Sequence, residues 1–450
     1  MDYKEARAYL DEAGKTGSIL GLESMRTLLK ELGDPQDALK FIHIAGTNGK
    51  GSVLAYLSTI LKEAGYRVGR YISPTLFSYR ERIQVNEEYI TREALAEHAT
   101  CIRDAAARLK AAGKPQPTVF EIETALAFLY FVQEKCDIVV LETGMGGDTD
   151  ATNAVQTTVL EVLVSISRDH MQFLGNTLAE IAAHKAGIIK PGTAVVSARQ
   201  EPEAMQVIRE TAAQQRAKLC IADVAKATDV SCGLWRQSFS YGGYKDLEIH
   251  LAGTCQIENA VVAVEAVRAL NSLGFKITEG QLRAGLSKTV WRGRFTVLNE
   301  KPLFIIDGAH NRGAAEQLKA SIETYLKGRR IIAICGVLRD KEYEAVLKTV
   351  APYIKEMITI ETPDNPRALP AEKLAEIAGK YIPEVHAAGS IAEAAAESIA
   401  KAEREDGVIL AFGSLSFLGA LAGEAEKVTA NGVNSNKINC GGEMPVRCRG

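Results

Sequence analysis

With 450 residues, 46% of them hydrophobic and 24% charged, the chain is long enough for two domains with sizeable cores. The net charge of −3 comes from interspersed acids and bases, which argues against a nucleic-acid partner. No secretory signal and no apolar run of about 18 residues is evident, so we expect a cytoplasmic protein without a membrane span. The eight widely spaced cysteines lack the CxxC pairs of a zinc site, and most are expected to be small buried hydrophobes.

Apolar runs alternate with helical patterns through the first half of the chain. Strands are predicted at 40–44, 137–142 and 158–166, and helices at 53–64, 124–133 and 178–189. The strands are continuously apolar, which is typical of parallel strands covered on both faces. This half is therefore predicted to be an α/β domain.

The second half begins with a mixed, more strand-like region, 193–244, followed by a long helix at 257–273. The segment Trp291–Phe295 interrupts the helical spacing, and we place the domain boundary just after it. Further strands are predicted at 303–306, 330–335, 357–361 and 407–412.

These elements predict an α/β fold: a mostly parallel sheet domain with a phosphate loop, followed by a smaller Rossmann-like α/β domain. The expected ranges are 1–296 for the first, larger domain and 297–427 for the C-terminal domain. Residues 428–450 are polar, rich in glycine and asparagine and without periodicity, so they are predicted to be a flexible tail.

The segment HIAGTNGKGS, residues 43–52, lies between the first strand and its helix. Backbone N–H groups at a helix N-terminus, freed of side-chain bulk by glycines, can cradle phosphates, and Lys50 adds a positive charge. Ile44 stands where the first glycine of the usual GxxxxGK[ST] pattern belongs, and Gly51 precedes Ser52. The alternative is a glycine-rich turn without a ligand.

Polar residues follow other predicted strands. Glu142 ends one strand before a glycine-rich turn, where a carboxylate could reach a divalent cation beside the phosphates, although a turn-capping role is the alternative. His170 could offer a nitrogen to the same cation or be a structural histidine. Lys185 and Lys190 lie near the end of a predicted helix. For these two, the alternative to a role in the site is that of solvated cations, which the helix dipole favours there.

In the second domain, Asp307 ends a strand before the turn Gly308–Asn311. Polar groups at that edge could face a nucleotide across a cleft. An ordinary αβ turn is the alternative.

Taken together, these segments resemble folylpolyglutamate synthase and dihydrofolate synthase, within the wider Mur-ligase-like family. The resemblance runs from about Tyr9 to Gly423 and rests on motifs in the family's order. They are HIAGTNGKGS, YISPTLFSYRERI, TVFEIETALAF, LETGMGGDTDATN, SRDHMQFLGNTLAEIAAHKAGIIKPG, WRGRF, FIIDGAHN and FGSLSFLG.

The resemblance implies roles for individual residues. The ATP phosphates would be held by Gly49, Lys50, Gly51 and Ser52, and other nucleotide contacts would come from Asn259, Arg294, Asp307 and His310. Magnesium ligands would be Ser73, Glu142 and His170, and Arg82 would lie near the folate substrate. Lys185 aligns with a lysine that is carbamylated in the family. The groups implied in catalysis are Lys50, Glu142, His170 and Lys185.

The chain departs from the family pattern at three places. Thr75 replaces a histidine after Ser-Pro, and Asp148-Thr149 stands where a basic and an apolar residue are usual. His184 replaces a glutamate before Lys185. These places lie on the expected substrate or metal side of the cleft.

The resemblance implies an ATP- and Mg²⁺-dependent ligase that activates a carboxylate as an acyl phosphate and joins it to L-glutamate. The acceptor would be a folate or dihydropteroate, and a monomer is expected. Three alternatives are a Mur-type ligase acting on a nucleotide-linked peptide, an ATP-driven switch or binding module, and an inactive homologue that only binds folates. The SPT and DATN segments argue against the first.

Overall fold

The computed structural model describes residues 1–14 and 21–436. Contacts divide the chain into two compact units, Met1–Arg294 with Arg312–Tyr325, and Phe295–Asn311 with Leu326–Gly450. Helix α11 (Arg312–Tyr325) thus groups with the first unit, although it follows the first strands of the second in the chain.

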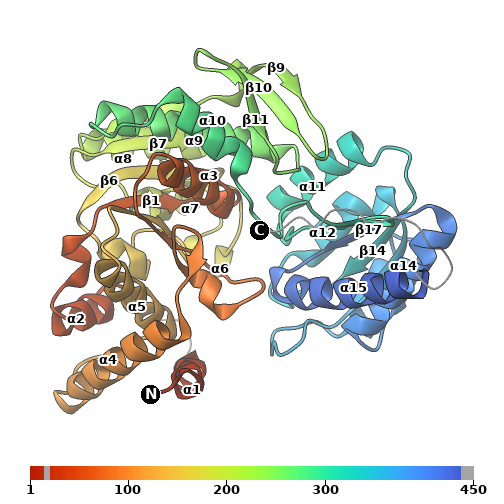
Figure 1. Cartoon of the computed structure of the whole chain (residues 1–450), viewed down its shortest axis with the longest axis horizontal. Helices are drawn as coiled ribbons and strands as arrows, with labels where there is room; N and C mark the ends of the chain where they lie inside the picture. The colour runs from red at the N-terminus through yellow and green to blue at the C-terminus, as the bar shows by residue number, and fades with distance from the viewer. Residues whose placement is uncertain (15–20, 437–450) are drawn as a thin grey trace. The chain divides into compact units, whose positions relative to one another are not determined.

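The first unit is built on an eight-stranded sheet with the order β4-β3-β2-β5-β1-β6-β7-β8 (Figure 1). All neighbouring pairs from β2 to β8 are parallel, whereas β3 and β4 add an antiparallel edge. The strands are β1 (Phe41–Ala45), β2 (Val68–Tyr71), β3 (Ile83–Val85), β4 (Glu88–Tyr89), β5 (Ile138–Glu142), β6 (Thr158–Leu163), β7 (Ala194–Ala198) and β8 (Lys218–Ala222).

Helices cover both faces of this sheet, as the continuously buried strands β1 and β5 require. They are α1 (Tyr3–Ala13), α2 (Glu23–Glu31), α3 (Lys50–Glu63), α4 (Arg92–Ala111), α5 (Val119–Gln133), α6 (Met171–Leu174), α7 (Leu178–Ala186), α8 (Pro202–Gln214), α9 (Cys255–Ser272) and α10 (Glu279–Lys288).

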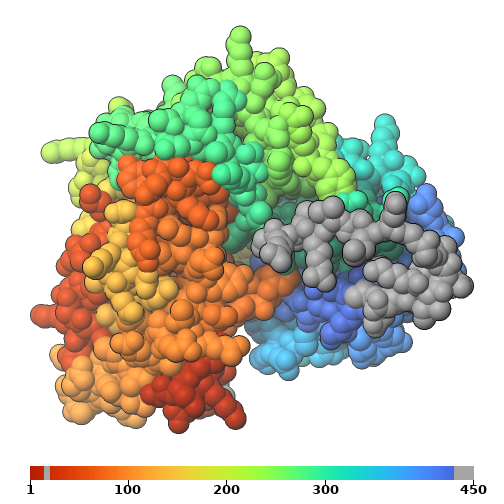
Figure 2. Space-filling model, in the orientation of Figure 1, coloured from red at the N-terminus to blue at the C-terminus, as the bar shows by residue number. Residues whose placement is uncertain are grey.

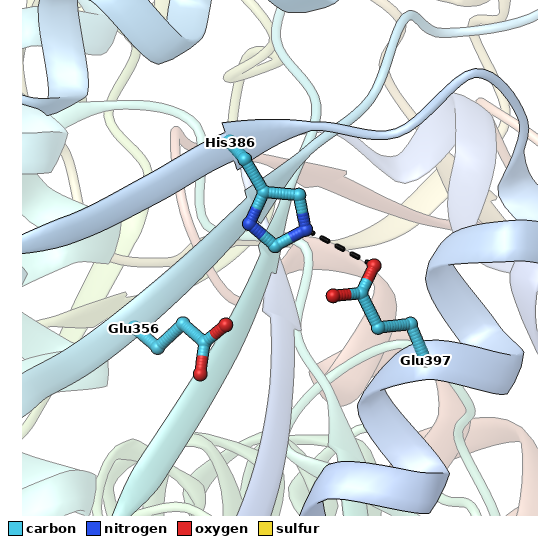
Figure 3. A group of neighbouring side chains, drawn as sticks. All are labelled: Glu356, His386 and Glu397. Carbon is cyan, nitrogen blue, oxygen red and sulfur yellow. Dashed lines mark hydrogen bonds and ion pairs between the residues drawn. The ribbon is translucent and has the colours of Figure 1, made fainter.

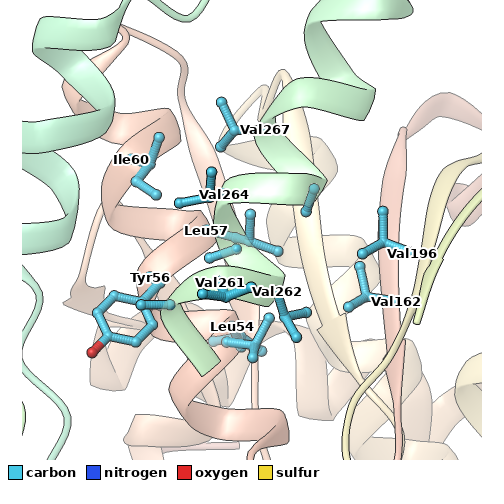
Figure 4. Close-up of a cluster of buried hydrophobic side chains, with 14 of the residues drawn as sticks. Leu54, Tyr56, Leu57, Ile60, Val162, Val196, Val261, Val262, Val264 and Val267 are labelled. Atoms are coloured by element: carbon cyan, nitrogen blue, oxygen red, sulfur yellow. The ribbon is translucent and has the colours of Figure 1, made fainter. Parts of the chain in front are cut away.

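Apolar side chains fix α3 and α9 to one face of the sheet. Figure 4 shows Leu54 and Leu57 of α3 beside Val261 and Val264 of α9, and Val162 belongs to the same buried cluster. Fully burying an aliphatic side chain of this size contributes about 1.5–3 kcal/mol, so this cluster holds the two helices firmly. A second cluster packs α1, α2, α4 and α5 on the sheet's other face, and a third packs α7 and α8.

A small antiparallel sheet lies in the region predicted to be strand-like. Its order is β11-β10-β9, with β9 (Thr228–Ser231), β10 (Gln237–Tyr241) and β11 (Tyr244–Ile249). Residues of this region form part of the surface in Figure 2, where they are yellow-green. Trp235, just before β10, is 55% exposed.

The second unit is a six-stranded sheet with the order β12-β13-β17-β14-β15-β16, parallel except for β12. Its strands are β12 (Thr296–Glu300), β13 (Leu303–Ile306), β14 (Ile331–Cys335), β15 (Ile354–Thr359), β16 (Glu384–Ala387) and β17 (Val408–Phe412). Its helices are α12 (Tyr343–Val350), α13 (Ala371–Ala378), α14 (Ile391–Glu405) and α15 (Leu415–Asn436). The α/β fold class is confirmed, but the short strands β12 and β16 were not predicted.

Two further expectations differ from the structure. Helix α15 continues to Asn436, so 428–436 are helical where a flexible tail was predicted, because a packed helix propagates at low cost once it is nucleated. Residues 437–450 of that tail lie outside the described residues. Of the six cysteines described, only Cys136 and Cys335 are buried, so the expectation that most are core residues is wrong. None of the described helices is long and apolar enough to cross a membrane.

Candidate active site

Three loops of the first unit start from neighbouring strands at one edge of the sheet. Strand β1 lies between β5 and β6, with Ile44 opposite Glu142 and Ala45 opposite Leu163. Because parallel strands end at the same edge, the loops after β1, β5 and β6 begin side by side. The sequence predicted polar groups in all three loops, and the sheet order brings their starting points together.

The loop after β1 has the backbone of a phosphate-binding turn. Gly46 has a φ of 149° and Gly49 a φ of 97°, a region that favours glycine. A Cβ on Gly46 would lie 2.2 Å from Val164, so the close approach to the strand-end residues after β6 also requires glycine. Helix α3 then begins at Lys50, which leaves its first N–H groups pointing into the loop.

Lys50 lies over this loop. Its Nζ is 3.3 Å from the carbonyl oxygen of Gly46 and 3.5 Å from that of Thr47, and its closest carboxylate atom is Glu142 Oε1 at 3.9 Å. At that separation the ion pair is loose. The ammonium is therefore held by weak contacts and can be taken over by a more negative partner such as a phosphate.

Glu142 is buried at the end of β5, with 5% of its surface exposed. Burial raises the pKa of its carboxyl group, while the Lys50 ammonium and the Ser73 backbone N–H act in the opposite direction. The Ser73 N–H lies 3.4 Å from Oε2. A buried carboxylate whose nearest partners are 3.4 Å or more away is costly to keep charged. Such a carboxylate is typical of a group that binds a cation.

Lys185 is a second buried cation at the same loop. Its Nζ donates a hydrogen bond of 2.8 Å to the carbonyl oxygen of Gly46, which Lys50 also approaches. Burial and, to a smaller extent, repulsion from Lys50 lower the pKa of Lys185 to about 7. The alternative of a solvated cation at a helix end is thus wrong for Lys185. Lys190, by contrast, bonds the side chain of Asn153 at 2.7 Å.

Helix α9 supports the phosphate loop from behind. Gln256 donates to Ser52 Oγ at 3.3 Å and accepts from Asn259 at 3.1 Å. A Cβ on Gly49 would lie 2.4 Å from Asn259 Oδ1, so Asn259 is in direct contact with the loop, although contact with a nucleotide stays a prediction. Sequence reasoning missed Gln256, because more than 200 residues separate it from Ser52.

Trp291 is another contact that the sequence did not indicate. A Cβ on Gly51 would lie 2.4 Å from its indole ring. The glycine that interrupts the usual pattern before Ser52 therefore makes room for this tryptophan.

Ser73 and Arg82 belong to the segment between β2 and β3. Arg82 is largely buried, lies 3.3 Å from Glu123 Oε1, and is close enough to Glu142 to lower its pKa. Arg294 acts on Glu142 in the same direction. His170, in contrast, has a side chain that is 39% exposed and lies beside Asp169 in the left-handed region, with a φ of 51°.

Two family models match the chain. The Mur ligase middle domain covers residues 44–267, and the Mur ligase glutamate ligase domain covers residues 293–415. The dihydrofolate synthase/folylpolyglutamate synthase of Bacillus subtilis (strain 168) is 38% identical over 83% of this chain and 88% of its own length. The folylpolyglutamate synthase of Lacticaseibacillus casei is 34% identical over 82% and 88%.

The chain belongs to the folylpolyglutamate synthase family of Mur ligases. Solved structures agree with this assignment. The Mycobacterium tuberculosis folylpolyglutamate synthase complexed with ADP and AMPPCP has a TM-score of 0.85 at 28% identity, over 95% of this chain and 99% of that one. An FPGS complex with AMPPCP and folate has a TM-score of 0.80 at 30% identity, over 96% and 100%. The chain is thus an ATP-dependent ligase.

Within this Mur ligase, two of the residues that depart from the family pattern face each other. His184 Nδ1 lies 3.0 Å from both carboxylate oxygens of Asp148, and the Asp148 N–H donates to the His184 carbonyl oxygen at 2.9 Å. The loop after β5 is therefore fastened to the end of α7, one residue before Lys185. Asp148 and His184, two of the residues that depart from the family pattern, thus pair with each other.

In the second unit of this Mur ligase, Asp307 closes its own turn. Its two oxygens accept from the N–H groups of Phe295 and Ala309, both at 2.8 Å. His310 Nδ1 lies 2.8 Å from the Gly308 carbonyl oxygen. These contacts order the turn, and a contact between either side chain and the nucleotide stays a prediction.

One more group of possible metal ligands lies in the second unit. Figure 3 shows Glu356 of β15, His386 of β16 and Glu397 of α14 pointing toward one another. However, the Lys401 ammonium pairs with Glu356 and lies 2.9 Å from Glu397 Oε1, while His386 Nε2 is 3.0 Å from Glu397 Oε2. Lys401 thus supplies the positive charge that a metal would bring, and we assign this group no ligand.

Proposed function

We propose that this ligase adds L-glutamate to the carboxylate of a folate, using ATP and passing through an acyl phosphate. The observation that carries the proposal is the buried carboxylate of Glu142 beside Lys50 at the phosphate loop, with Arg82 near enough to lower its pKa. Folate and a nucleotide analogue occupy an FPGS of the same fold, which supports the choice of substrates.

The residues of the phosphate loop would hold the nucleotide. The N–H groups at the start of α3 would donate to the terminal phosphates, and Lys50 would exchange its loose pairing with Glu142 for a phosphate oxygen. Lowering the negative charge on the γ-phosphate makes it accessible to an anionic nucleophile, the acceptor carboxylate.

The donor set also fits magnesium. Mg²⁺ favours oxygen ligands and keeps several waters, and the Glu142 carboxylate and the Ser73 hydroxyl would supply such oxygens. When bound, Mg²⁺ neutralises charge on the transferred phosphoryl group. His170 offers a nitrogen, which is a less favourable ligand for this ion, so its predicted role as a ligand is the weakest of the three.

Arg82 would orient the acceptor. Its guanidinium would hold the anionic acceptor so that a carboxylate oxygen attacks the γ-phosphorus and ADP leaves. The amine of glutamate then attacks the acyl carbon. An amide forms, phosphate departs, and the attacking nitrogen loses one proton. Dihydropteroate is the second acceptor to test, because a relative carries both synthase names.

Lys185 is proposed to become a carbamate, as the resemblance implies. Carbamate formation needs a neutral amine, which attacks CO₂ and loses one proton. With a pKa of about 7, Lys185 holds a large neutral fraction at neutral pH. The resulting anion would also relieve the repulsion between Lys185 and Lys50.

A coupled assay tests the proposal. The protein is incubated with Mg-ATP, L-glutamate and either folate or dihydropteroate, and ADP and product mass are followed together. We expect ADP release only when both acceptor and glutamate are present, with a mass gain of one glutamyl unit. ADP release without them would favour the ATP-driven switch, and no ADP release would favour the inactive homologue. The cytoplasmic location and the monomeric state stay predictions.

A further inference from the structure

Arg82 does not stand alone in the first unit, because a carboxylate from a different element is packed against it. Glu123 lies on α5 with 5% of its surface exposed, and its Oε1 is 3.3 Å from Arg82 Nε. The side chains are 13% and 7% exposed, so the pair is shielded from water on both sides. At such burial an ion pair is held in place far more strictly than at the surface.

Tyr79 fixes the same carboxylate from another direction. Its hydroxyl donates to Glu123 Oε1 at 2.7 Å, and the guanidinium carbons of Arg7 and Arg82 lie 3.4 Å and 5.7 Å from the centre of its ring. The same oxygen, Glu123 Oε1, thus accepts a hydrogen bond from the phenol and lies close to Arg82 Nε.

The charge balance around Arg82 follows from this packing. Burial alone would lower the pKa of Arg82, but the Glu123 carboxylate, together with Tyr71 and Tyr79, outweighs it and the pKa is raised. Arg82 also acts on Glu142, the buried carboxylate at the phosphate loop. The guanidinium therefore links a carboxylate inside α5 to the carboxylate of the candidate active site.

We propose that Glu123 is a positioning residue for substrate binding: its buried carboxylate, 3.3 Å from Arg82 Nε, holds the guanidinium in place for the anionic acceptor. Guanidinium groups bind carboxylates through two parallel N–H groups in a fixed plane, so a guanidinium that is held in place offers its ligand a defined geometry. The proposal rests on the function of Arg82 proposed above, and it adds a residue from the TVFEIETALAF segment.

The first test compares Glu123→Gln with the unaltered protein. Glutamine keeps the volume and an acceptor for the Tyr79 hydroxyl but removes the charge that anchors Arg82. We expect KM for the folate acceptor to rise by about tenfold and KM for ATP to change little, when both are measured well below the melting temperature of the variant. A melting temperature that falls while KM for the acceptor stays constant would mean a purely structural residue. A lower KM would mean that Glu123 competes with the substrate for Arg82, and either result overturns the proposal.

The second test is a double-mutant cycle with Arg82→Gln. If Glu123 acts through Arg82, adding Glu123→Gln to Arg82→Gln should cost no further increase in KM, whereas independent residues would give additive effects. Arg82→Gln alone distinguishes a failure of the role of Arg82 from a failure of the role of Glu123. If it leaves KM for the acceptor unchanged, the role of Arg82 fails; if it raises KM but Glu123→Gln does not, only the positioning role of Glu123 fails.

Glu123→Gln could also lower the stability of the fold. Tyr79→Phe provides an independent check, since it removes the phenol donor to Glu123 and leaves both charges in place. We expect KM for the acceptor to rise by about two- to threefold, in the same direction as Glu123→Gln but less. No change, or a change confined to KM for ATP, would contradict the proposed anchoring.

Discussion

Two groups of charged side chains, each built around a buried carboxylate, differ in how well they are paired. In the second unit, Glu356, Glu397, His386 and Lys401 form a closed set in which each charge has a close partner. At the phosphate loop, Lys50 and Lys185 share the carbonyl oxygen of Gly46.

The nearest carboxylate of that loop, Glu142, is 3.9 Å from Lys50. Each group holds one carboxylate away from water, Glu356 or Glu142, which is costly unless it is paired. The closed set in the second unit stabilises a fold. The loose set at the loop is arranged for partners that arrive with a substrate.

The largest effect is expected from removing a charge of the loose set. Lys50→Ala and Glu142→Gln should each lower kcat by about 10³-fold, because each removes a group that acts on the transferred phosphoryl. The melting temperature should change little, because neither charge is closely paired. Steady-state ADP release and thermal unfolding measure the two quantities.

Lys62 offers a matched control on the same helix. It pairs with Glu87 at the far end of α3. Lys62→Ala should keep kcat within about twofold of the unaltered protein. A comparable loss of kcat in the Lys62 and Lys50 variants would mean that the loop has no special role.

The opposite pattern is expected from the closed set. Lys401→Met leaves Glu356, which is 4% exposed, without its main partner. The free energy of unfolding should fall by on the order of 2 kcal/mol, with kcat unchanged at temperatures where the protein is folded. Denaturant unfolding measures it, and Lys427→Ala, which breaks the exposed pair with Glu424, is the control. A loss of kcat without a loss of stability would reverse the roles given to the two groups.

Glu161 is a third buried carboxylate to compare with Glu142 and Glu356. It has no close ion-pair partner, and it lies within strand β6 and not at the end of the strand. It is fully buried, and burial raises its pKa to about 7 although the Lys190 N–H donates to it at 3.2 Å. Between about pH 4.5 and 7 the unfolded chain gives up this proton and the folded chain retains it, so stability is lost as the pH rises.

Glu161→Gln should remove this penalty. Relative to the unaltered protein, the variant should gain up to about 3 kcal/mol in the free energy of unfolding at pH 8 and almost nothing at pH 4. Denaturant unfolding across this pH range measures the difference, and kcat should not change. A gain that is the same at both pH values would mean that Glu161 does not titrate between them.

Local patterns were enough to predict the parts of the site that lie within one strand–loop–helix unit. The phosphate loop has its glycines where backbone conformation requires them, and the acid at the end of β5 faces it because the apolar strands pair in parallel. The boundaries of β13 (Leu303–Ile306) were predicted to the residue, since a short apolar run between polar residues leaves little choice.

Contacts between distant segments could not be predicted in this way. Gln256 on Ser52, Trp291 on Gly51 and Glu123 on Arg82 join elements that only the tertiary fold brings together. The local pattern around each of these residues is already explained by secondary structure or burial, for example by a buried helix face. Nothing in the sequence therefore indicates the contact with the distant segment. The grouping of α11 with the first unit is likewise invisible in the order of elements.

In the proposed mechanism, a carboxylate attacks the terminal phosphate at the loop formed by Gly46–Ser52. The most direct test uses folate labelled with ¹⁸O in the carboxylate that is activated, together with Mg-ATP and L-glutamate, and measures the inorganic phosphate by mass spectrometry. Attack by the carboxylate predicts that one labelled oxygen appears in the phosphate for each amide formed. Phosphate that carries no label, released at the same rate as ADP, would contradict the acyl phosphate and the ligase mechanism built on it.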